Sequence, residues 1–495
     1  MTTVQSDSGV LAGDPRMLID GELQLTGSGA MFDVIHPASE QVAGQVTDGT
    51  VDDMARAVGA ARRAFDTTEW SRDVEFRYHC LTQLHAALER NKEQLRRITV
   101  TEVGCPVSLT GAHIESPIEE VAHWAELGRK FEYLEDTGLH DAIGGQTRRL
   151  IHWDAVGVVG AITPWNVPFY LNIAETTPAL MAGNTVVLKP AQLTPWAGSE
   201  LGRIVAEETD IPAGVLNVVT SNANEVGAAL SADPRVDMIT FTGSTATGRA
   251  ILAAGAATVK RTLLELGGKS AHVVLDDADL TAALPMAATL ACVMSGQSCV
   301  LPSRILLPRS RYEEGLAILQ ATMEGFPVGD PWDPSKLQGP QISAGQRDKV
   351  LGLIASGIDS GARLVTGGGV PPEFPTGYYV QPTLLADVDP DSQVAQEEIF
   401  GPVLCVIPYD TEDEAIAIAN NSIYGLSGQV SSADEDRALK VALRLRTGSA
   451  NINGGQHFGL TSPFGGSKQS GLGRRNGVHG FQEYLELKTL GLPAN

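Results

Sequence analysis

A cysteine, a glutamate and an asparagine stand in short motifs whose residue types suit attack on a carbonyl carbon. Cys299 ends the segment Ser295-Gly-Gln-Ser-Cys299 and closely follows a run of apolar residues. A thiolate is a strong nucleophile, although a cysteine behind an apolar run is more often a small buried hydrophobic residue. Glu265 lies between two leucines and precedes the pair Gly267-Gly268, where the backbone can approach a neighbour closely. The carboxylate of Glu265 is a candidate general base, and the alternative is a strand-end residue that faces water.

The asparagine of interest is Asn166, in the segment Thr163-Pro-Trp-Asn-Val-Pro168. Two prolines restrict the backbone around it, and a rigidly held amide can donate to a developing oxyanion. The alternative is an asparagine that satisfies its own turn. A glycine-containing segment, Phe241-Thr-Gly-Ser-Thr-Ala-Thr-Gly248, suits phosphate binding at the start of a helix. It lacks the Gly-x-Gly-x-x-Gly pattern of dinucleotide sites, so it is a weak signal alone.

The elements that must position these residues alternate between short apolar runs and helical patterns. Strands separated by helices of this length predict an α/β fold with parallel sheets. A longer apolar region predicts a buried helix at 282–294, directly before the cysteine motif, and a glycine- and proline-rich stretch predicts a loop at 366–379. The runs that predict buried strands are 156–162, 184–188, 216–219, 238–241 and 271–275.

Two segments depart from this alternation. Residues 139–153 alternate polar and apolar side chains around a Gly144-Gly145 turn, which predicts a hairpin that projects from the body. The tail from 481 to 490 also alternates enough to form a strand. These two segments are candidates to pair with each other, either within a subunit or between subunits.

Composition limits the classes of function and partner. The net charge of −23 disfavours a nucleic-acid partner, because phosphate binding needs a basic surface. The odd number of cysteines, five in 495 residues, does not suggest a disulfide framework. Residues 1–13 have neither the basic start nor the apolar run of a secretory signal, and no apolar stretch reaches membrane-spanning length, so we expect a cytoplasmic protein. The histidines form no metal-binding pattern, so no metal is expected.

Taken together, the motifs closely resemble those of the aldehyde dehydrogenase superfamily, in particular its hydrolytic, non-acylating, NAD(P)-dependent members. The resemblance extends from about Ile35 to the tail, and Cys299 follows Glu265 by 34 residues, the separation that the family shows. The matching motifs, in the family's order, are Pro164-Trp-Asn166, Lys189-Pro-Ala191, Phe241-Thr-Gly-Ser244, Glu265-Leu-Gly-Gly-Lys269, Gly296-Gln-Ser-Cys299, Glu397-Glu-Ile-Phe-Gly-Pro402, Pro463-Phe-Gly-Gly466 and Ser470-Gly471.

The resemblance implies a division of the chain into three parts. A Rossmann-like cofactor-binding domain would comprise residues 1–135 and 156–265, and an α/β catalytic domain residues 266–475. Residues 136–155 and 476–495 would form a small β element for oligomerisation, giving a homodimer or homotetramer.

The resemblance also implies a mechanism, NAD as the cofactor, and a set of site residues. Cys299 would attack the aldehyde, Asn166 and the Cys299 backbone N–H would hold the oxyanion, and hydride transfer to the nicotinamide would leave a thioester. Glu265 would activate the water that hydrolyses this thioester. In the cofactor site, Lys189 would hold the adenosine ribose, Ser244 the pyrophosphate and Glu398 the nicotinamide ribose, with Phe400 packed near the nicotinamide. The full cofactor set is Ile162, Thr163, Pro164, Trp165, Lys189, Ala191, Gln192, Gly243, Ser244, Leu266, Gly267, Glu398 and Phe400.

Several positions depart from the family pattern. Gln192 stands where NAD-preferring relatives usually carry Glu, so NADP is less excluded than usual. Glu175 falls where many relatives have Lys, and Ser221 replaces a frequent Gly near the adenine site. Arg475 stands where relatives usually have Glu, and the sequence suggests no role for it. Gly455 replaces a frequent aromatic residue of the substrate loop, which suggests a wide pocket there.

The sequence says less about the substrate than about the reaction. By resemblance, residues 169–171 and the loop 454–458 line the pocket, and a medium-sized apolar or aromatic aldehyde is the expected substrate. One alternative function is a CoA-acylating semialdehyde dehydrogenase, although such relatives typically lack the Glu at position 265. Others are a thiol hydrolase or esterase without redox chemistry, and a catalytically silent binding protein on the same scaffold.

Overall fold

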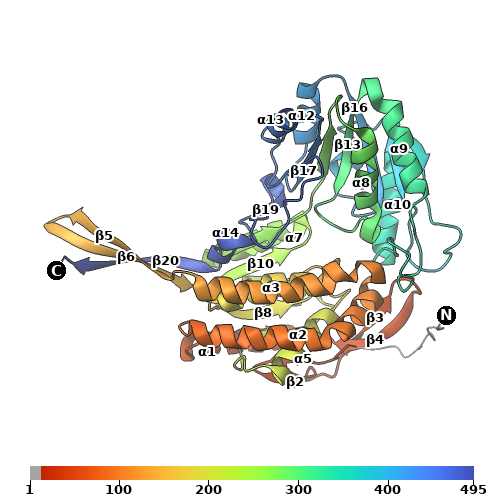
Figure 1. Cartoon of the computed structure of the whole chain (residues 1–495). Coiled ribbons are helices and arrows are strands. Elements are labelled where there is room, and N and C mark those ends of the chain that lie inside the picture. The colour runs from red at the N-terminus through yellow and green to blue at the C-terminus, as the bar shows by residue number, and fades with distance from the viewer. Residues whose placement is uncertain (1–12, 495) are drawn as a thin grey trace.

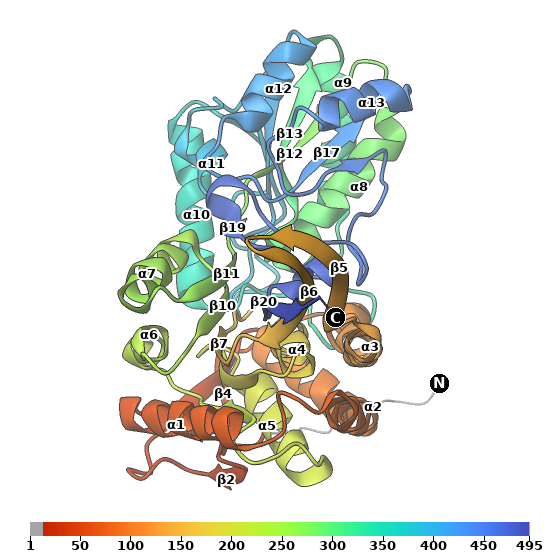
Figure 2. The ribbon, with the colours of Figure 1, turned by 90° about the vertical axis from the view of Figure 1, so that its left-hand side faces the viewer.

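The computed structural model describes residues 13–494, which form two large sheets with helices on both sides and a third, projecting sheet (Figures 1 and 2). This confirms the predicted α/β class, whereas the proposed domain boundaries stay a prediction. The absence of a secretory signal was predicted from a segment that lies almost wholly outside the described residues. Within residues 13–494, no helix is long and apolar enough to cross a membrane.

The first sheet has eight strands, of which the central five are parallel. Neighbouring residues of its strands point into different cores: Val186 packs in one hydrophobic cluster and Val187 in another. A strand buried on both faces needs an almost continuous apolar sequence, as these strands have. In order across the sheet they are β19 (Gly471–Leu472), β11 (Arg261–Glu265), β10 (Met238–Thr242), β7 (Val158–Ile162), β8 (Thr185–Lys189), β9 (Leu216–Val218), β1 (Met17–Ile19) and β2 (Glu22–Gln24).

Helices cover both faces of this sheet. One face packs against α2 (Val74–Val103), α3 (Thr110–Lys130), α4 (Pro168–Met181) and α5 (Trp196–Glu208). The other face packs against α1 (Val51–Thr67), α6 (Asn224–Ala232) and α7 (Thr245–Gly255). Helix α1 begins where Thr50 and Asp53 form a capping box, and its apolar residues recur at helical spacing. A separate two-stranded sheet consists of β3 (Met31–His36) and β4 (Gln41–Thr47).

The second sheet has seven strands and begins directly after the motif that contains Glu265. Its strands, in order, are β14 (Arg363–Thr366), β15 (Thr383–Ala386), β16 (Val403–Tyr409), β13 (Pro302–Pro308), β12 (Ser270–Val274), β17 (Gly428–Ser431) and β18 (Asn451–Ile452). Its helices are α8 (Leu280–Cys292), α9 (Tyr312–Glu324), α10 (Ala344–Asp359), α11 (Gln393–Gln396), α12 (Glu412–Asn420) and α13 (Glu435–Ala442).

Two sequence predictions for this part were close to the structure. The predicted buried helix at 282–294 is α8, but it ends two residues early because Val293 leaves the helical conformation, with ψ of 139°, and Met294 then has a left-handed backbone. The predicted loop at 366–379 contains no regular element beyond its first residue.

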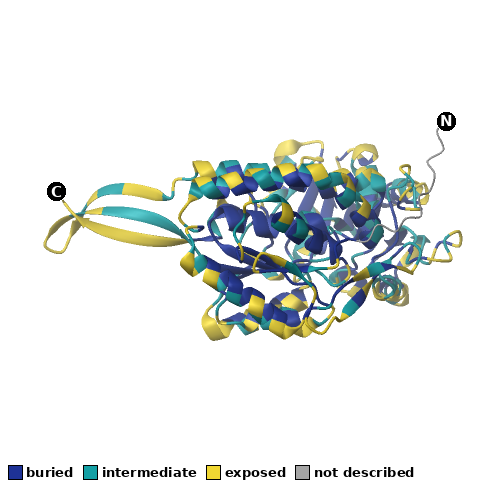
Figure 3. Cartoon of the chain, turned by 90° about the horizontal axis from the view of Figure 1, so that it is seen from below, coloured by how far each residue is buried: buried dark blue, intermediate teal, exposed yellow. Residues whose placement is uncertain are grey.

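The predicted hairpin is confirmed, and it carries the C-terminal strand. Strands β5 (Leu134–Ala142), β6 (Gly145–Ala155) and β20 (Leu485–Pro493) form an antiparallel sheet in which β20 pairs with β6 of the same chain. This sheet projects from the body and is largely exposed (Figures 1 and 3).

The predicted start of the tail strand at Phe481 was wrong. Phe481 belongs to helix α14 (Gly477–Gln482), and the strand begins at Leu485. The ring of Phe481 is fully buried and packs against the rings of Trp124 and Phe131, so burial of this side chain overrides the alternating pattern.

Candidate active site

A cavity of about 320 Å³ lies where the carboxyl ends of β10 and β11 meet segments of the second sheet's half. Parallel α/β sheets bind their ligands at this edge. The cavity brings together Cys299, Glu265 and Asn166. It is lined by Pro164, Trp165, Asn166, Val167, Tyr170, Leu171, Ala174, Thr242, Gly243, Ser244, Glu265, Leu266, Gly267, Ser298, Cys299, Val300, Gln346, Lys349, Glu398, Phe400, Phe458, Phe464, Arg475 and Asn476.

Five residues of the predicted cofactor set are not in the cavity wall. Ile162 ends β7 and Thr163 follows it; Lys189 ends the neighbouring strand β8, and Ala191 and Gln192 follow that strand. Ile162 is in register with Lys189, so the five residues extend the same edge of the first sheet.

The two glycines after Glu265 allow close packing of three chain segments. A Cβ atom on Gly267 would lie 2.4 Å from the Glu398 carboxylate, and one on Gly268 would lie 2.6 Å from the Cys299 carbonyl oxygen. The Gly268 N–H donates to Glu398 Oε1 at 3.0 Å. The predicted close approach of this backbone therefore exists, and it joins the motifs of the base, the thiol and Glu398.

The segment before Cys299 has an unusual backbone. Met294, Ser295 and Gly296 all have positive φ, and a Cβ on Gly296 would lie 2.1 Å from the carbonyl oxygen of Gly401. Hydrogen bonds hold this conformation, since the Ser295 hydroxyl donates to the Gly339 carbonyl at 2.7 Å. Such a backbone persists only where its surroundings support it, which is common at functional sites.

Cys299 and Asn166 face the same cavity from different segments. Burial raises the pKa of the Cys299 thiol to about 12, the carboxylates of Glu398 and Glu265 add to this rise, and Arg475 opposes it. Asn166 is buried, and one N–H of its amide donates to the Gln297 carbonyl at 3.0 Å. The amide is therefore held by a residue two positions before Cys299 rather than by its own turn.

Glu265 ends β11 and is only 2 % exposed, so the alternative of a water-facing residue is wrong. Neither of its carboxylate oxygens has a hydrogen-bond partner among the described residues. Burial raises the pKa of Glu265 to about 8, Arg475 and Arg474 oppose that rise, and Glu175 adds to it. A buried carboxylate with free oxygens and a pKa near neutrality has the properties of a general base.

The other end of the cavity suits a dinucleotide. Ser244 caps α7, whose N-terminus opens into the cavity beside Gly243. Such a helix start binds phosphate. The buried Lys189 ammonium donates to the carbonyls of Pro190 and Ser221 at 3.3 and 3.2 Å, and burial lowers its pKa to about 8. Across the cavity, the rings of Trp165 and Phe400 meet edge-on at 5.3 Å. A helix start, the Glu398 carboxylate and two aromatic rings thus line this part of the cavity, and the buried ammonium of Lys189 lies at the same edge of the first sheet.

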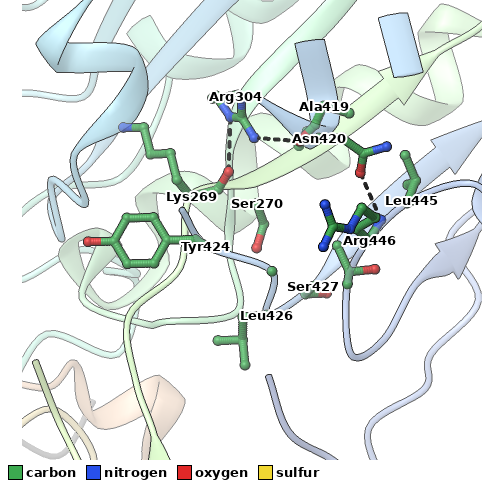
Figure 4. A pocket seen from close by; sticks show the side chains of 14 residues that line it. Lys269, Ser270, Arg304, Ala419, Asn420, Tyr424, Leu426, Ser427, Leu445 and Arg446 are labelled. Carbon is green, nitrogen blue, oxygen red and sulfur yellow. Dashed lines mark hydrogen bonds between the residues drawn. The ribbon is translucent and has the colours of Figure 1, made fainter. Parts of the chain in front are cut away.

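A smaller hollow behind the site has a structural role. Its volume of about 10 Å³ is no more than one water molecule needs. Figure 4 shows Arg304 bridging the hollow: its guanidinium donates to the carbonyls of Lys269 and Ala419, both at 2.9 Å. Because Lys269 ends the motif that begins at Glu265, this bridge anchors the base's segment to the second sheet.

Sequence reasoning missed the partnership of Glu175 and Arg475. Both had been noted as departures from the family pattern, and the structure joins them in a buried ion pair beside Thr242. The signal available was that the two departures carry opposite charges. The sequence also gave no indication of Gln346 and Lys349, which reach the cavity from α10.

Comparisons with known proteins agree with this geometry. Residues 25–490 match the model of the aldehyde dehydrogenase family. The chain is 41 % identical to a 3-succinoylsemialdehyde-pyridine dehydrogenase from a Pseudomonas species, over 95 % of this chain and 97 % of that protein. It is 40 % identical to a geranial dehydrogenase from Castellaniella defragrans, over 92 % and 95 % of the two chains.

Solved structures show the same likeness. A Mycobacterium tuberculosis aldehyde dehydrogenase complexed with NAD⁺ superposes with a TM-score of 0.92 at 41 % identity, over 97 % of this chain and 98 % of that one. An aldehyde dehydrogenase C mutant from Pseudomonas syringae, complexed with NAD⁺ and octanal, also gives 0.92, at 38 % identity over 97 % and 98 %. The chain belongs to the aldehyde dehydrogenase family and is an NAD-dependent oxidoreductase that acts on aldehydes.

Proposed function

We propose that this enzyme oxidises its aldehyde to a carboxylic acid through a thioester on Cys299. The observation that carries the proposal is that Cys299, Glu265 and Asn166 line one cavity, with both Glu265 oxygens free of partners. The thiolate of Cys299 attacks the aldehyde carbon, and the second N–H of the Asn166 amide donates to the oxygen that becomes negative. NAD, when bound, supplies the hydride acceptor.

Glu265 is the base in the second half of this reaction. It takes a proton from water, and the resulting hydroxide attacks the thioester carbon and displaces the Cys299 thiolate. The carboxylate form is needed, and it predominates above the pKa of about 8. We therefore expect the rate of thioester hydrolysis to rise with pH through this region.

The thirteen predicted cofactor residues are proposed to keep the roles that the family implies. Lys189 and Ser244 bind the ribose and pyrophosphate, Glu398 binds the second ribose, and Phe400 packs against the nicotinamide. Gln192 carries no charge to repel a 2′-phosphate, so we propose that NADP is also tolerated.

The substrate is proposed to be a medium-sized apolar or aromatic aldehyde. The cavity wall beyond Cys299 carries Tyr170, Leu171, Phe458 and Phe464. The ring of Phe458 lies 6.3 Å from that of Tyr170 and 5.4 Å from that of Phe464. Two relatives are named for an aldehyde with a pyridine ring and for geranial, which fits such a wall.

The projecting sheet is proposed to join copies of this chain into a dimer or tetramer. Leu139, Leu487 and Leu490 are exposed on it, and unpaired edge strands invite a partner. Deleting residues after Gln482 removes β20 and should give monomers or insoluble protein. A soluble, active monomer after this deletion would contradict the proposal.

All five cysteines are free thiols, which supports the expected cytoplasmic location.

The test of the proposed chemistry compares two thiols. NADH formation is measured with a panel of aldehydes in Cys299→Ala and in Cys292→Ala, together with labelling by an electrophilic aldehyde mimic. Cys292 is the control because it is buried at the end of α8, and burial raises its pKa. We expect Cys299→Ala to lose both activity and labelling. If Cys292→Ala loses them and Cys299→Ala keeps them, the proposal is wrong.

A further inference from the structure

The part of the cavity wall formed by Arg475 and Thr242, here called the floor, carries one partner of a buried ion pair that joins distant parts of the chain. Arg475, after β19, donates from Nη2 to the Glu175 carboxylate in α4 and to the Thr242 hydroxyl at the end of β10. Glu175 is fully buried and Arg475 is 7 % exposed. Removing one partner of a buried ion pair strongly destabilises the fold, because the remaining charge is then buried without a counter-charge.

The two partners of this pair differ in how completely they are bonded. The Glu175 carboxylate also accepts hydrogen bonds from the hydroxyls of Thr240 and Thr242, which hold it against β10. By contrast, the Nε–H of Arg475 has no partner among the described residues. Arg475 lines the same cavity as Glu265. The pair is therefore anchored on its acidic side, and its cation faces the reacting groups.

We propose that Arg475 is a positioning residue for the aldehyde dehydrogenase reaction: its guanidinium, held by Glu175, keeps a permanent positive charge beside Glu265 and Cys299. This inference rests on the proposed roles of those two residues. Arginine remains charged at any pH at which the enzyme works, so it supplies a constant field and exchanges no protons.

The charges around Glu265 have opposing effects. Arg475 and Arg474, on the segment after β19, lower its pKa, while Glu175 on α4 raises it. Besides burial, the pKa of the Cys299 thiol is raised by the charges of Glu398 and Glu265 and lowered by that of Arg475, so only Arg475 of these three favours the thiolate. Arg475 thus favours the charged form of both reacting groups, against the burial that disfavours it.

Further titratable groups surround the cation of this pair. Tyr484, beyond α14, and Tyr170 on α4 interact with the charge of Arg475. Glu120 on α3 is buried without a hydrogen-bond partner among the described residues, and burial raises its pKa to about 7, against the effect of Arg475. Glu120 is therefore largely ionised only above neutrality, whereas the charge on Arg475 is constant.

The pair also explains two departures from the family pattern at once. By resemblance to the family, Glu175 falls where many relatives have Lys and Arg475 where relatives usually have Glu, so the two charges would be exchanged. Either change alone would place two like charges together in a buried site. Both changes together keep a neutral pair and move its positive end from α4 to the segment after β19.

The test uses two variants of similar shape whose effects have opposite signs. An aryl ester such as p-nitrophenyl acetate acylates the Cys299 thiol without NAD, and the hydrolysis of the acyl-enzyme is followed against pH. Arg475→Gln removes the cation and should move the rise of this rate to higher pH, by about one unit or more. Glu175→Gln leaves the cation unopposed and should move the rise to lower pH. The alkylation rate of Cys299 in the NAD-free enzyme, measured against pH, should also move to higher pH in Arg475→Gln, because Arg475 favours the thiolate.

Three further variants keep the test decisive. Arg475→Lys retains the charge and should keep the parent profile. The double variant Glu175→Gln/Arg475→Gln contains no unpaired charge, so it should fold even if the single variants do not. We expect it to shift the rise to higher pH by less than Arg475→Gln. An unchanged profile in the folded double variant, or shifts of the same sign in the two single variants, would overturn the inference. Normal acyl-enzyme hydrolysis in Glu265→Gln would instead refute the proposed function itself.

Discussion

The two ends of the cavity are built in different ways. At the cofactor end, main-chain atoms make the important contacts: the start of α7 at Ser244 opens into the cavity, and the backbone at Gly267 and Gly268 packs against Glu398. At the floor, charged side chains make the important contacts. The Arg475–Glu175 pair joins residues that are 300 positions apart in the sequence. The first arrangement depends on small residues in local motifs, and the second depends on two charges that must change together.

This difference explains why the two ends tolerate change differently. A main-chain contact leaves little room for variation, because an added Cβ meets a neighbouring atom: the Glu398 carboxylate at Gly267 and the Cys299 carbonyl oxygen at Gly268. A side-chain pair can be rebuilt with its charges exchanged, provided that it stays neutral overall. By resemblance to the family, the glycine motif at 267–268 and Glu398 match the usual pattern. Side chains differ at Gln192 and Ser221 near the proposed adenosine site, and at both Glu175 and Arg475 on the floor.

Among the variants that compare the two ends of the cavity, the largest effect is expected from a single methyl group at the cofactor end. In Gly268→Ala the added Cβ would lie 2.6 Å from the Cys299 carbonyl oxygen and would displace the nucleophile. We expect kcat/KM to fall by about 100-fold or more, because small misplacements of reacting groups have effects of that order. The control is Gly352→Ala in α10, where no atom lies within 4 Å of the added Cβ. Equal activity of the two variants would contradict the importance of main-chain packing here.

A smaller effect is expected where the cofactor end departs from the family. If Gln192 lies in the proposed adenosine site, Gln192→Glu places a carboxylate near the ribose, where it would repel a 2′-phosphate. Like charges at about 4 Å repel by about 4 kcal/mol at an effective dielectric of 20, and even about 1.4 kcal/mol after solvent screening is a factor of about ten. The ratio of kcat/KM for NAD to that for NADP should therefore rise at least about tenfold. An unchanged ratio would place the discrimination elsewhere, for example near Ser221.

The smallest effect is expected at the exposed end of the cavity wall, where the ring of Phe458 lies against those of Tyr170 and Phe464. Phe458 is 49 % exposed, so only about half of its surface can contribute apolar contacts to a substrate or to the wall. Phe458→Ala should weaken kcat/KM for octanal by about fivefold, or about 1 kcal/mol, with little change for acetaldehyde. Parallel losses for both aldehydes would show that the ring supports the catalytic residues instead.

Sequence patterns predicted the features that depend on local rules. The α/β class followed from apolar runs separated by helices, and the hairpin followed from alternation around Gly144-Gly145. The cavity does unite Cys299, Glu265 and Asn166, although their roles stay proposals. The predicted start of the tail strand at Phe481 was wrong, because burial of this ring against aromatic rings distant in the sequence outweighed the local pattern. Arg475 had no interpretation because its partner lies far away in the sequence.

The central claim, that Glu265 activates the water that hydrolyses a Cys299 thioester, can be tested by intact-protein mass spectrometry. Glu265→Gln, mixed with NAD and an aldehyde such as octanal, keeps the shape of the side chain but loses the base. Steady-state turnover should fall by about 10²–10⁴-fold. A mass increase corresponding to one acyl group should accumulate, and it should be absent from Glu265→Gln/Cys299→Ala. An inactive Glu265→Gln that carries no acyl group would contradict the claim and place Glu265 before thioester formation, in activation of the thiol.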